Sequence, residues 1–180
     1  SQADCQWEIG LRQDSVSSLK QMLTLNPTDH QGVRYLLGAR LLELDQNEAF
    51  DELLEGHGDK STFFLYSKLL REIRRGTDEA SLRALLAAAQ KKNSFVVPFL
   101  LESELLPGEI PETSTSGSYD EAVLYAADLA HAWKQTPGAM TWLRESVAES
   151  ARTERKKPIA FSPQVKKRLK KLPQVSGGHW

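Results

Sequence analysis

Six basic residues occupy polar positions on the first helices of two predicted helix pairs, where they could bind an anion. Arginine and lysine donate charge-assisted hydrogen bonds to carboxylates, and arginine can donate two in parallel. If three or four of these cations converge, they could clamp an acidic peptide or a C-terminal carboxylate. The alternative is that they solvate an exposed helix face, as surface charges commonly do. The six candidates are Arg34, Arg40, Lys68, Arg71, Arg74 and Arg75.

Two tryptophans flank a predicted turn at Thr136-Pro137-Gly138 and could also take part in binding. Exposed tryptophans are frequent hot spots of protein interfaces. Trp133 shares a helical stripe with Leu129, so we expect it to pack in the core. Trp142 stays a candidate for the binding face, with core packing as the alternative.

Residues of the kinds used in catalysis are scattered, and their spacing does not indicate an active site. Cys5, the only cysteine, has no identifiable histidine partner, and the sequence contains no Walker loop, GxGxxG or GxSxG motif. His131 follows Asp128 by three residues, a spacing more typical of a surface pair than of a base and its orienting acid. We therefore predict that the chain is not an enzyme and has no catalytic, metal or cofactor site. The histidines lie in separate segments, without the i,i+4 spacing of metal ligands: His30, His57, His131 and His179.

Charge is divided unevenly along the chain. Residues 1–151 hold 14 basic and 23 acidic residues, a balance of −9, whereas residues 152–180 hold nine basic residues and one acid, a balance of +8. The basic tail could remain solvated, fold back on the acidic body, bind the phosphates of nucleic acid, or lie on an anionic membrane through a short amphipathic helix at 163–172. No aromatic residues alternate with the cations to stack on bases. The tail candidates are Arg155, Lys156, Lys157, Lys166, Lys167, Arg168, Lys170 and Lys171.

Length and composition fit one ordinary domain. The chain has 180 residues, of which 40% are hydrophobic, and its mean hydropathy is −0.44. No apolar run approaches the roughly 18 residues that a membrane span needs. A single cysteine cannot form an intramolecular disulfide, which favours a reducing compartment. We therefore expect a cytoplasmic protein.

The elements that must position these residues are helices, and part of their pattern repeats. The segment YLLGARLLE at 35–43 aligns with FFLYSKLLR at 63–71, at an offset of 28 residues, and Glu48-Ala49 recurs as Glu79-Ala80 at an offset of 31. A helix–turn–helix period in this range is typical of helical repeats, which bury their apolar faces by stacking. The sequence shows no strand-like alternation of useful length, so the predicted class is all-α, with about seven or eight helices.

Capping signals predict where the helices begin and end. We expect Asp14, Asp29, Thr77 and Ser118 to cap helix starts, and Asn26-Pro27, Gly76 and Asn93 to mark helix ends. Ser118 with Glu121 three residues later forms a capping box. Pro98 predicts a helix that begins near Val97 and ends before Pro107, because proline is tolerated only in the first turn.

Two further features complete the predicted layout. The breaker-rich stretch 107–117 predicts a loop that is either functional or mobile. Thr136 and Pro137 predict the N-cap and first residue of the last body helix, which fades near Arg152. The predicted layout is a helical repeat domain at 1–151, with the loop as an insertion, and a basic tail at 152–180.

Two segments carry a family resemblance: NPTDHQGVRYLL at 26–37 and YDEAVLYAADLAHAWKQTPGAMTWL at 119–143. They resemble a group of mostly bacterial, uncharacterised tetratricopeptide-repeat-like proteins. The resemblance covers roughly residues 14–145 and implies a right-handed stack of antiparallel helix pairs with a protein-interaction role. The pattern departs from a standard repeat of about 34 residues. Gly38 can supply the small residue at a helix crossing, but its counterpart is Tyr66.

The sequence thus predicts a degenerate α-solenoid that acts as an adaptor or scaffold and binds a protein or acidic peptide through one face. The alternative is a nucleic-acid-associated protein that uses its basic C-terminal segment. The two differ in their salt response and in which deletion abolishes binding. The sequence leaves the oligomeric state open.

Overall fold

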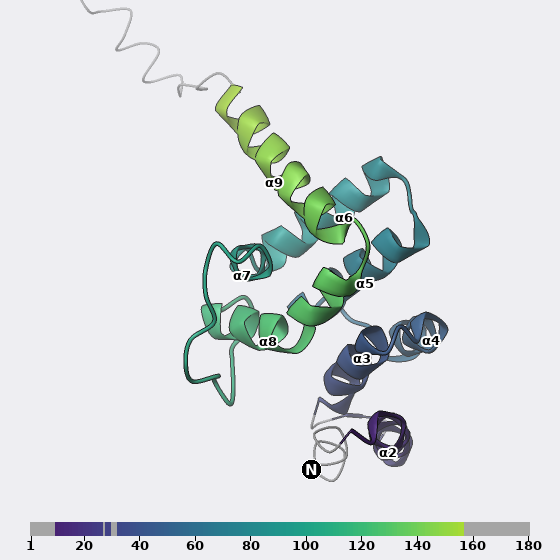
Figure 1. Ribbon diagram of the computed structural model, residues 1–180. Coiled ribbons are helices and arrows are strands. Elements are labelled where there is room, and N and C mark those ends of the chain that lie inside the picture. Colours follow the sequence, from purple (N-terminus) through teal and green to yellow (C-terminus); the bar gives the residue numbers. More distant parts are fainter. Residues whose placement is uncertain (1–9, 27, 30–31, 157–180) are drawn as a thin grey trace, which may run out of the picture. The chain divides into compact units, whose positions relative to one another are not determined.

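The computed structural model describes residues 10–26, 28–29 and 32–156, and side chains only as far as Thr153. Within these ranges the chain forms eight α-helices and no β-strand, which confirms the predicted all-α class (Figure 1). The helices are α2 (Arg12–Leu25), α3 (Val33–Glu43), α4 (Asn47–His57), α5 (Thr62–Arg75), α6 (Glu79–Lys92), α7 (Val96–Leu100), α8 (Tyr119–Gln135) and α9 (Ala139–Lys156).

The chain divides into two compact units, Ser1–Glu145 and Ser146–Trp180. The described part of the first unit contains α2 to α8 and the beginning of α9. The described part of the second unit is the remainder of α9, where Ser150 and Thr153 donate hydroxyl hydrogen bonds to backbone carbonyls four residues earlier. The predicted boundary after residue 151 stays a prediction.

The core of the first unit lies where α3, α5 and α8 pack against one another. Trp133, Tyr66 and Phe64 are among its largest fully buried side chains, and the predicted core position of Trp133 is confirmed. Helix α8 contacts both α3 and α5, although in a solenoid each repeat touches only its neighbours. The arrangement as a stack therefore stays a prediction.

Gly38 lies at a close contact of the first helix pair with α5. A Cβ atom on Gly38 would stand 2.9 Å from Cε1 of Phe63 and 3.4 Å from Cδ2 of Leu53. These distances are shorter than or at the limit of ordinary carbon–carbon contacts of about 3.5–4.0 Å. Gly38 is therefore a close-contact position, but its nearest neighbour is Phe63 on α5, and its role at a crossing within a repeat pair stays a prediction. Its repeat counterpart Tyr66 is also buried, and its hydroxyl donates to the carbonyl oxygen of Asn93.

The first two helix starts differ in how their N–H groups are satisfied. Asp14 was expected to cap α2, but the helix begins two residues earlier and its N-cap residue, Leu11, makes no side-chain hydrogen bond. Asp29 does serve α3, from outside the helix: its carboxylate accepts from the backbone N–H of Val33 at 2.6 Å and of Arg34 at 3.1 Å. A carboxylate at a helix N-terminus is also favoured by the helix dipole.

Helices α5 and α6 end as predicted, but the cap of α6 is shifted. Gly76 adopts the left-handed conformation that terminates α5, and Asn93 is the C-cap of α6. The predicted N-cap Thr77 is wrong by one residue. Asp78 accepts from the backbone N–H of Ser81, whereas the Thr77 hydroxyl donates to Glu72. Aspartate is preferred over threonine at N-caps, and its charged carboxylate is the stronger acceptor.

Helix α7 is much shorter than predicted. It begins at Val96, near the expected start, but ends at Leu100, and Glu102 then adopts a positive φ of 57°. The backbone N–H groups of Ser103 and Glu104 both donate to the carbonyl oxygen of Pro98, which closes the turn. The segment from there to Gly117 contains no helix, in agreement with the predicted loop at 107–117.

The turn between α8 and α9 corrects another prediction. Ser118 caps α8 as expected, by accepting from the N–H of Glu121. Thr136, however, is the C-cap of α8, and α9 begins only at Ala139. The first backbone bond of α9 runs from Trp142 to the carbonyl oxygen of Gly138. Thr136 and Pro137 therefore form the turn and do not open the helix.

Candidate functional site

Arg34 lies in a polar cluster at the start of α3. Its guanidinium donates to Asp29 at 2.8 Å, to Asp59 at 3.0 Å and to the hydroxyl of Tyr35 at 2.7 Å. Burial opposes its charge, but the hydrogen bonds to Asp59 and Asp29 outweigh this and raise the pKa of Arg34. The cluster fastens α3 to the segment that precedes α5, so this predicted groove cation already has two acidic partners within the chain.

Arg71 and Arg75 share one acidic partner on α4. Arg71 forms a two-point pair with Asp51, from Nε at 3.0 Å and from Nη2 at 2.7 Å, and Arg75 reaches the same carboxylate at 2.9 Å. The hydrogen bond from Arg71 lowers the pKa of Asp51 more than burial raises it. These pairs connect α5 to α4, and Arg75 also contacts Glu72 on its own helix.

Two other predicted cations, Arg40 and Lys68, do not take part in the pairing with Asp51. Arg40 pairs with Glu43 one turn later on α3, at 3.7 Å. Lys68 is exposed on α5 and lines an open hollow of about 500 Å³ together with Glu72, Thr77 and Ser81. The structure therefore does not bring the six cations to one point, and whether any of them binds a partner stays a prediction.

Arg74 is the predicted cation that lines a large recess of the first unit. Its Nε donates to the hydroxyl of Thr136 at 2.9 Å, and its Nη1 donates to the carbonyl oxygen of Leu42 at 3.0 Å and to Oδ1 of Asn47 at 3.2 Å. The side chain is 11% exposed. Burial lowers the pKa of Arg74, although Asp45 acts in the opposite direction. Its position joins the C-terminal ends of α3 and α8, where a cation is favoured by both helix dipoles.

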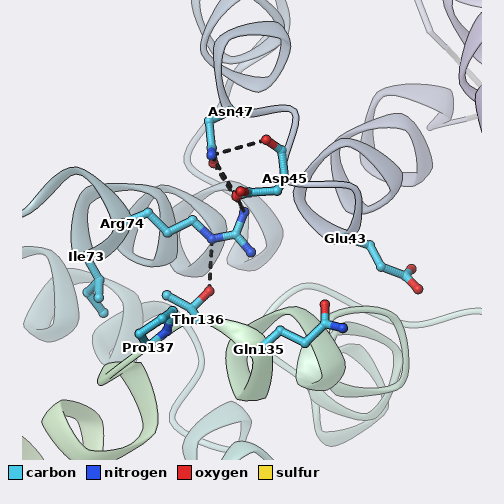
Figure 2. Close-up of a pocket in the computed structure, with 8 residues that line it drawn as sticks. All are labelled: Glu43, Asp45, Asn47, Ile73, Arg74, Gln135, Thr136 and Pro137. Carbon is cyan, nitrogen blue, oxygen red and sulfur yellow. Dashed lines mark hydrogen bonds and ion pairs between the residues drawn. The ribbon is translucent and has the colours of Figure 1, made fainter.

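This Arg74 cleft has a volume of about 670 Å³. Figure 2 shows the guanidinium pointing between Asp45 and Asn47 on one side and Thr136 on the other. Asp45 pairs with Arg74 at 3.2 Å, yet its side chain is 76% exposed. The lining residues are Glu43, Asp45, Asn47, Ile73, Arg74, Gln135, Thr136 and Pro137.

The two tryptophans of this region have different environments. Trp133 is fully buried, and its indole N–H donates to the hydroxyl of Tyr125 at 3.0 Å. Trp142 is only partly buried, and its indole N–H donates to Glu79 at the start of α6, at 2.8 Å. This hydrogen bond is the largest influence on the Glu79 carboxyl and lowers its pKa. Trp142 therefore bridges two helices, and its binding role stays a prediction.

A second recess, which we call the aromatic cleft, lies among α3, α5, α8 and the loop before α8. Its volume is about 410 Å³. Tyr35, Phe63 and Tyr125 supply aromatic surface, and the ring centroids of Tyr35 and Phe63 are 5.4 Å apart in an edge-to-face arrangement. The remaining lining residues are Ser61, Ser114, Ser116, Glu121, Leu124 and Asp128.

Glu121 connects this cleft to the rest of the fold and was assigned only a capping role from the sequence. Its Oε2 accepts from the hydroxyl of Thr62 at 2.6 Å, the amide of Asn93 at 3.1 Å and the backbone N–H of Gly117 at 2.6 Å. Only one half of the predicted capping box is present, the bond from the Glu121 N–H to the Ser118 hydroxyl. The Glu121 carboxylate accepts from Gly117 in place of Ser118, whose N–H donates to the carbonyl oxygen of Thr115. The bonds of Glu121 to Thr62 and Asn93, which are 59 and 28 residues away, were not predicted. Nor was either cleft predicted, because no local signal marks the segments that meet there.

The remaining predictions concern metal sites, membrane spans, Cys5 and the basic tail. Within the described ranges, no group of three or more His, Cys, Asp and Glu residues could hold a metal ion. In the same part of the chain, no helix is both long enough and apolar enough to cross a membrane. Cys5 and the tail cations from Arg155 onward lie outside the side chains that the structure describes, so the nucleic-acid alternative stays a prediction.

Comparison with known proteins finds no protein family, no curated protein and no solved structure that matches this chain. The tetratricopeptide-repeat-like resemblance therefore stays a prediction.

Proposed function

We propose that this chain is a protein-interaction module, an adaptor or scaffold that anchors an acidic group of a partner in the Arg74 cleft. The observation that carries the proposal is the pairing of a nearly buried guanidinium with an acid that is itself largely exposed. Arg74 is 11% exposed and Asp45 is 76% exposed. Asp45 thus occupies the position that a carboxylate of a partner would take.

Arg74 is fixed before any partner arrives. Bonds to Thr136 on one side and to the Leu42 carbonyl on the other hold the guanidinium from two helices. Ordering a long side chain on binding costs roughly 0.5–1.5 kcal/mol. An arginine that is already ordered avoids this cost, and its planar group presents N–H donors in a geometry that matches a carboxylate.

Exchange of Asp45 for an external carboxylate would cost little. Ion pairs that involve exposed side chains contribute about 0–1 kcal/mol, so the Asp45 pair is weak and readily replaced. The lowered pKa of Arg74 indicates that its burial is not fully compensated by this pair. A carboxylate enclosed by the cleft would be less solvated than Asp45 and would interact more strongly with the cation.

The size of the cleft suits an anchor point and not a whole partner. At about 670 Å³ it falls within the range of roughly 300–1,000 Å³ that is typical of small-ligand sites. It could enclose an acidic side chain or a chain terminus, while surrounding helix surfaces supply the remaining contact area. Helical hairpins with such anchors are consistent with the adaptor role that the resemblance implies.

The test is affinity capture from native lysate with three baits: the wild-type chain, Asp45→Asn and a matched control, Glu52→Gln. Glu52 is an exposed acid on α4, so both variants remove one negative charge. We expect Asp45→Asn to raise the yield of the same captured proteins by at least about threefold, because it removes the internal competitor. Glu52→Gln should leave the yield nearly unchanged.

Two further results would decide against the proposal. Equal yields with Asp45→Asn and Glu52→Gln would show that Asp45 does not compete with a partner. Loss of capture after nuclease treatment would favour the nucleic-acid alternative. An Arg74→Lys variant, checked for folding by circular dichroism, should reduce capture, because lysine lacks the planar guanidinium that bonds to Thr136 and Leu42 and fixes the position of the charge.

A further inference from the structure

The aromatic cleft has walls that can receive a cation. Tyr35 and Phe63 are partly exposed, whereas Tyr125, whose ring centroid lies 6.0 Å from that of Phe63, is buried behind them at 3% exposure. Phe63 is held in place because its ring edge rests against Gly38. The faces of aromatic rings attract cations within about 6 Å of the centroid. The ring of Tyr35 already binds one cation within the chain, because the Arg34 guanidinium lies 4.3 Å from its centroid.

The charges that line this cleft are negative. Glu121 and Asp128 both contribute to the wall, whereas none of the described lining residues is basic. Oε2 of Glu121 accepts from three neutral donors, and no ion pair to this carboxylate occurs among the described residues. The negative charge of Glu121 is therefore solvated by dipoles and not neutralised by a cation, which leaves a negative potential in the cleft.

The combination of rings, carboxylates and hydroxyls specifies the kind of occupant. A cation with an apolar stem satisfies both the rings and the carboxylates. Arginine fits better than lysine, because its flat guanidinium stacks on rings and its five donors can serve several acceptors at once. The wall contains the carboxylates of Glu121 and Asp128, both of which already interact within the chain, and the hydroxyls of Ser61, Ser114 and Ser116. A cleft of about 410 Å³ admits a side chain and not a helix.

We propose that the aromatic cleft binds an arginine side chain that a basic segment of a partner protein presents. This site is separate from the Arg74 cleft, and the proposal does not depend on the function proposed above. It assigns a role to the 107–117 insertion, because Ser114 and Ser116 form part of the wall. Gly117 ties the end of this loop to Glu121.

The test uses the full chain, labelled with nitrogen-15, and capped pentapeptides that carry one central arginine, lysine or citrulline between glycines. We expect the arginine peptide to shift amide signals around Phe63 and Leu124 and to bind at least about threefold more tightly than the citrulline peptide, which keeps the shape but lacks the charge. The lysine peptide should bind with intermediate strength. Equal binding of the arginine and citrulline peptides would overturn the proposal.

Two variants locate the site. Asp128→Asn should weaken arginine binding by about threefold or more, whereas its matched control Asp120→Asn, an exposed acid on the same helix, should change it little. Phe63→Leu should also weaken binding because it removes the ring. If Asp120→Asn and Asp128→Asn reduce affinity equally, the peptide senses only the overall charge, and the proposed site is wrong. Amide shifts confined to helices other than α3, α5 and α8 would also show that the proposed site is wrong.

Discussion

Replacement of Gly38 by alanine tests whether close packing in the first unit requires a residue without a side chain. The new Cβ would lie 2.9 Å and 3.0 Å from two ring carbons of Phe63 and 3.4 Å from Leu53. Its matched control is Gly56→Ala. Gly56 also lies within a helix, but a Cβ there would meet nothing within 4 Å. Both changes alter helix propensity in the same direction, so their difference isolates the packing effect.

The expected magnitudes follow from these distances. Replacing a helical glycine by alanine stabilises by about 0.5–1 kcal/mol when the site is open. Gly56→Ala should show this gain, reduced by its place near the end of α4. At Gly38 the same gain is opposed by overpacking, which typically costs about 1–3 kcal/mol. We therefore expect Gly38→Ala to be less stable than Gly56→Ala by about 1–3 kcal/mol.

The assay is urea unfolding followed by far-UV circular dichroism, with thermal unfolding as a second measure. A difference of 1–3 kcal/mol corresponds to about 3–9 °C in Tm for a chain of this size. A double-mutant cycle with Phe63→Leu identifies the clash directly. Leucine lacks the ring atoms nearest to Gly38, so the two changes together should be less damaging than their sum, with a coupling of at least about 1 kcal/mol.

Two results would refute this account. Equal stability of Gly38→Ala and Gly56→Ala would mean that α5 moves away at no cost, and the contact would not be a packing constraint. Strict additivity with Phe63→Leu would place the cost of Gly38→Ala somewhere other than the ring.

Two further predictions concern a helix cap and a charge pair. Ser118→Ala should lower the free energy of unfolding in urea by about 1 kcal/mol, because it removes the acceptor for the Glu121 N–H. Asp14→Ala should lower it by less than half as much. If both changes cost the same, Asp14 would be acting as a cap after all. Asp51→Asn should destabilise at pH 7 by about 0.5–1 kcal/mol. Since Arg71 lowers the pKa of Asp51 below its ordinary value of 3.8, this contribution is present above that value and is lost as pH falls through the lowered pKa. The gap between wild type and Asp51→Asn should therefore close in acid, and a gap that persists to about pH 2 would exclude the ion pair as its source.

Local signals in the sequence were sufficient where the determining contacts are local. The αL residue Gly76 and the cap Ser118 act within a few residues of themselves, and both were placed correctly. The shared stripe of Leu129 and Trp133 followed from helical spacing, and both residues are buried. Such features need no knowledge of the rest of the chain.

Predictions failed where a neighbouring residue or a distant contact competed for the same backbone. Thr77 was predicted to cap α6, but Asp78 takes that position and the Thr77 hydroxyl donates to Glu72. Thr136 has the right type for an N-cap, yet its hydroxyl donates to the Ala132 carbonyl and accepts from Arg74. The early end of α7 depends on the positive φ of Glu102. Because glutamate rarely adopts a positive φ, the residue type does not predict this turn.

The sequence by itself determined that the described part of this chain is helical and where most of its helices lie, because the spacing of apolar residues and capping groups acts over a few residues. Only the tertiary structure decided which partner each cation meets. Arg71 meets an acid 20 residues away, and Arg74 meets a threonine 62 residues away. Charge attracts any opposite charge that packing brings near, so composition cannot specify these pairs. The same reason applies to both clefts, whose walls come from segments that meet only when α3, α5 and α8 pack together.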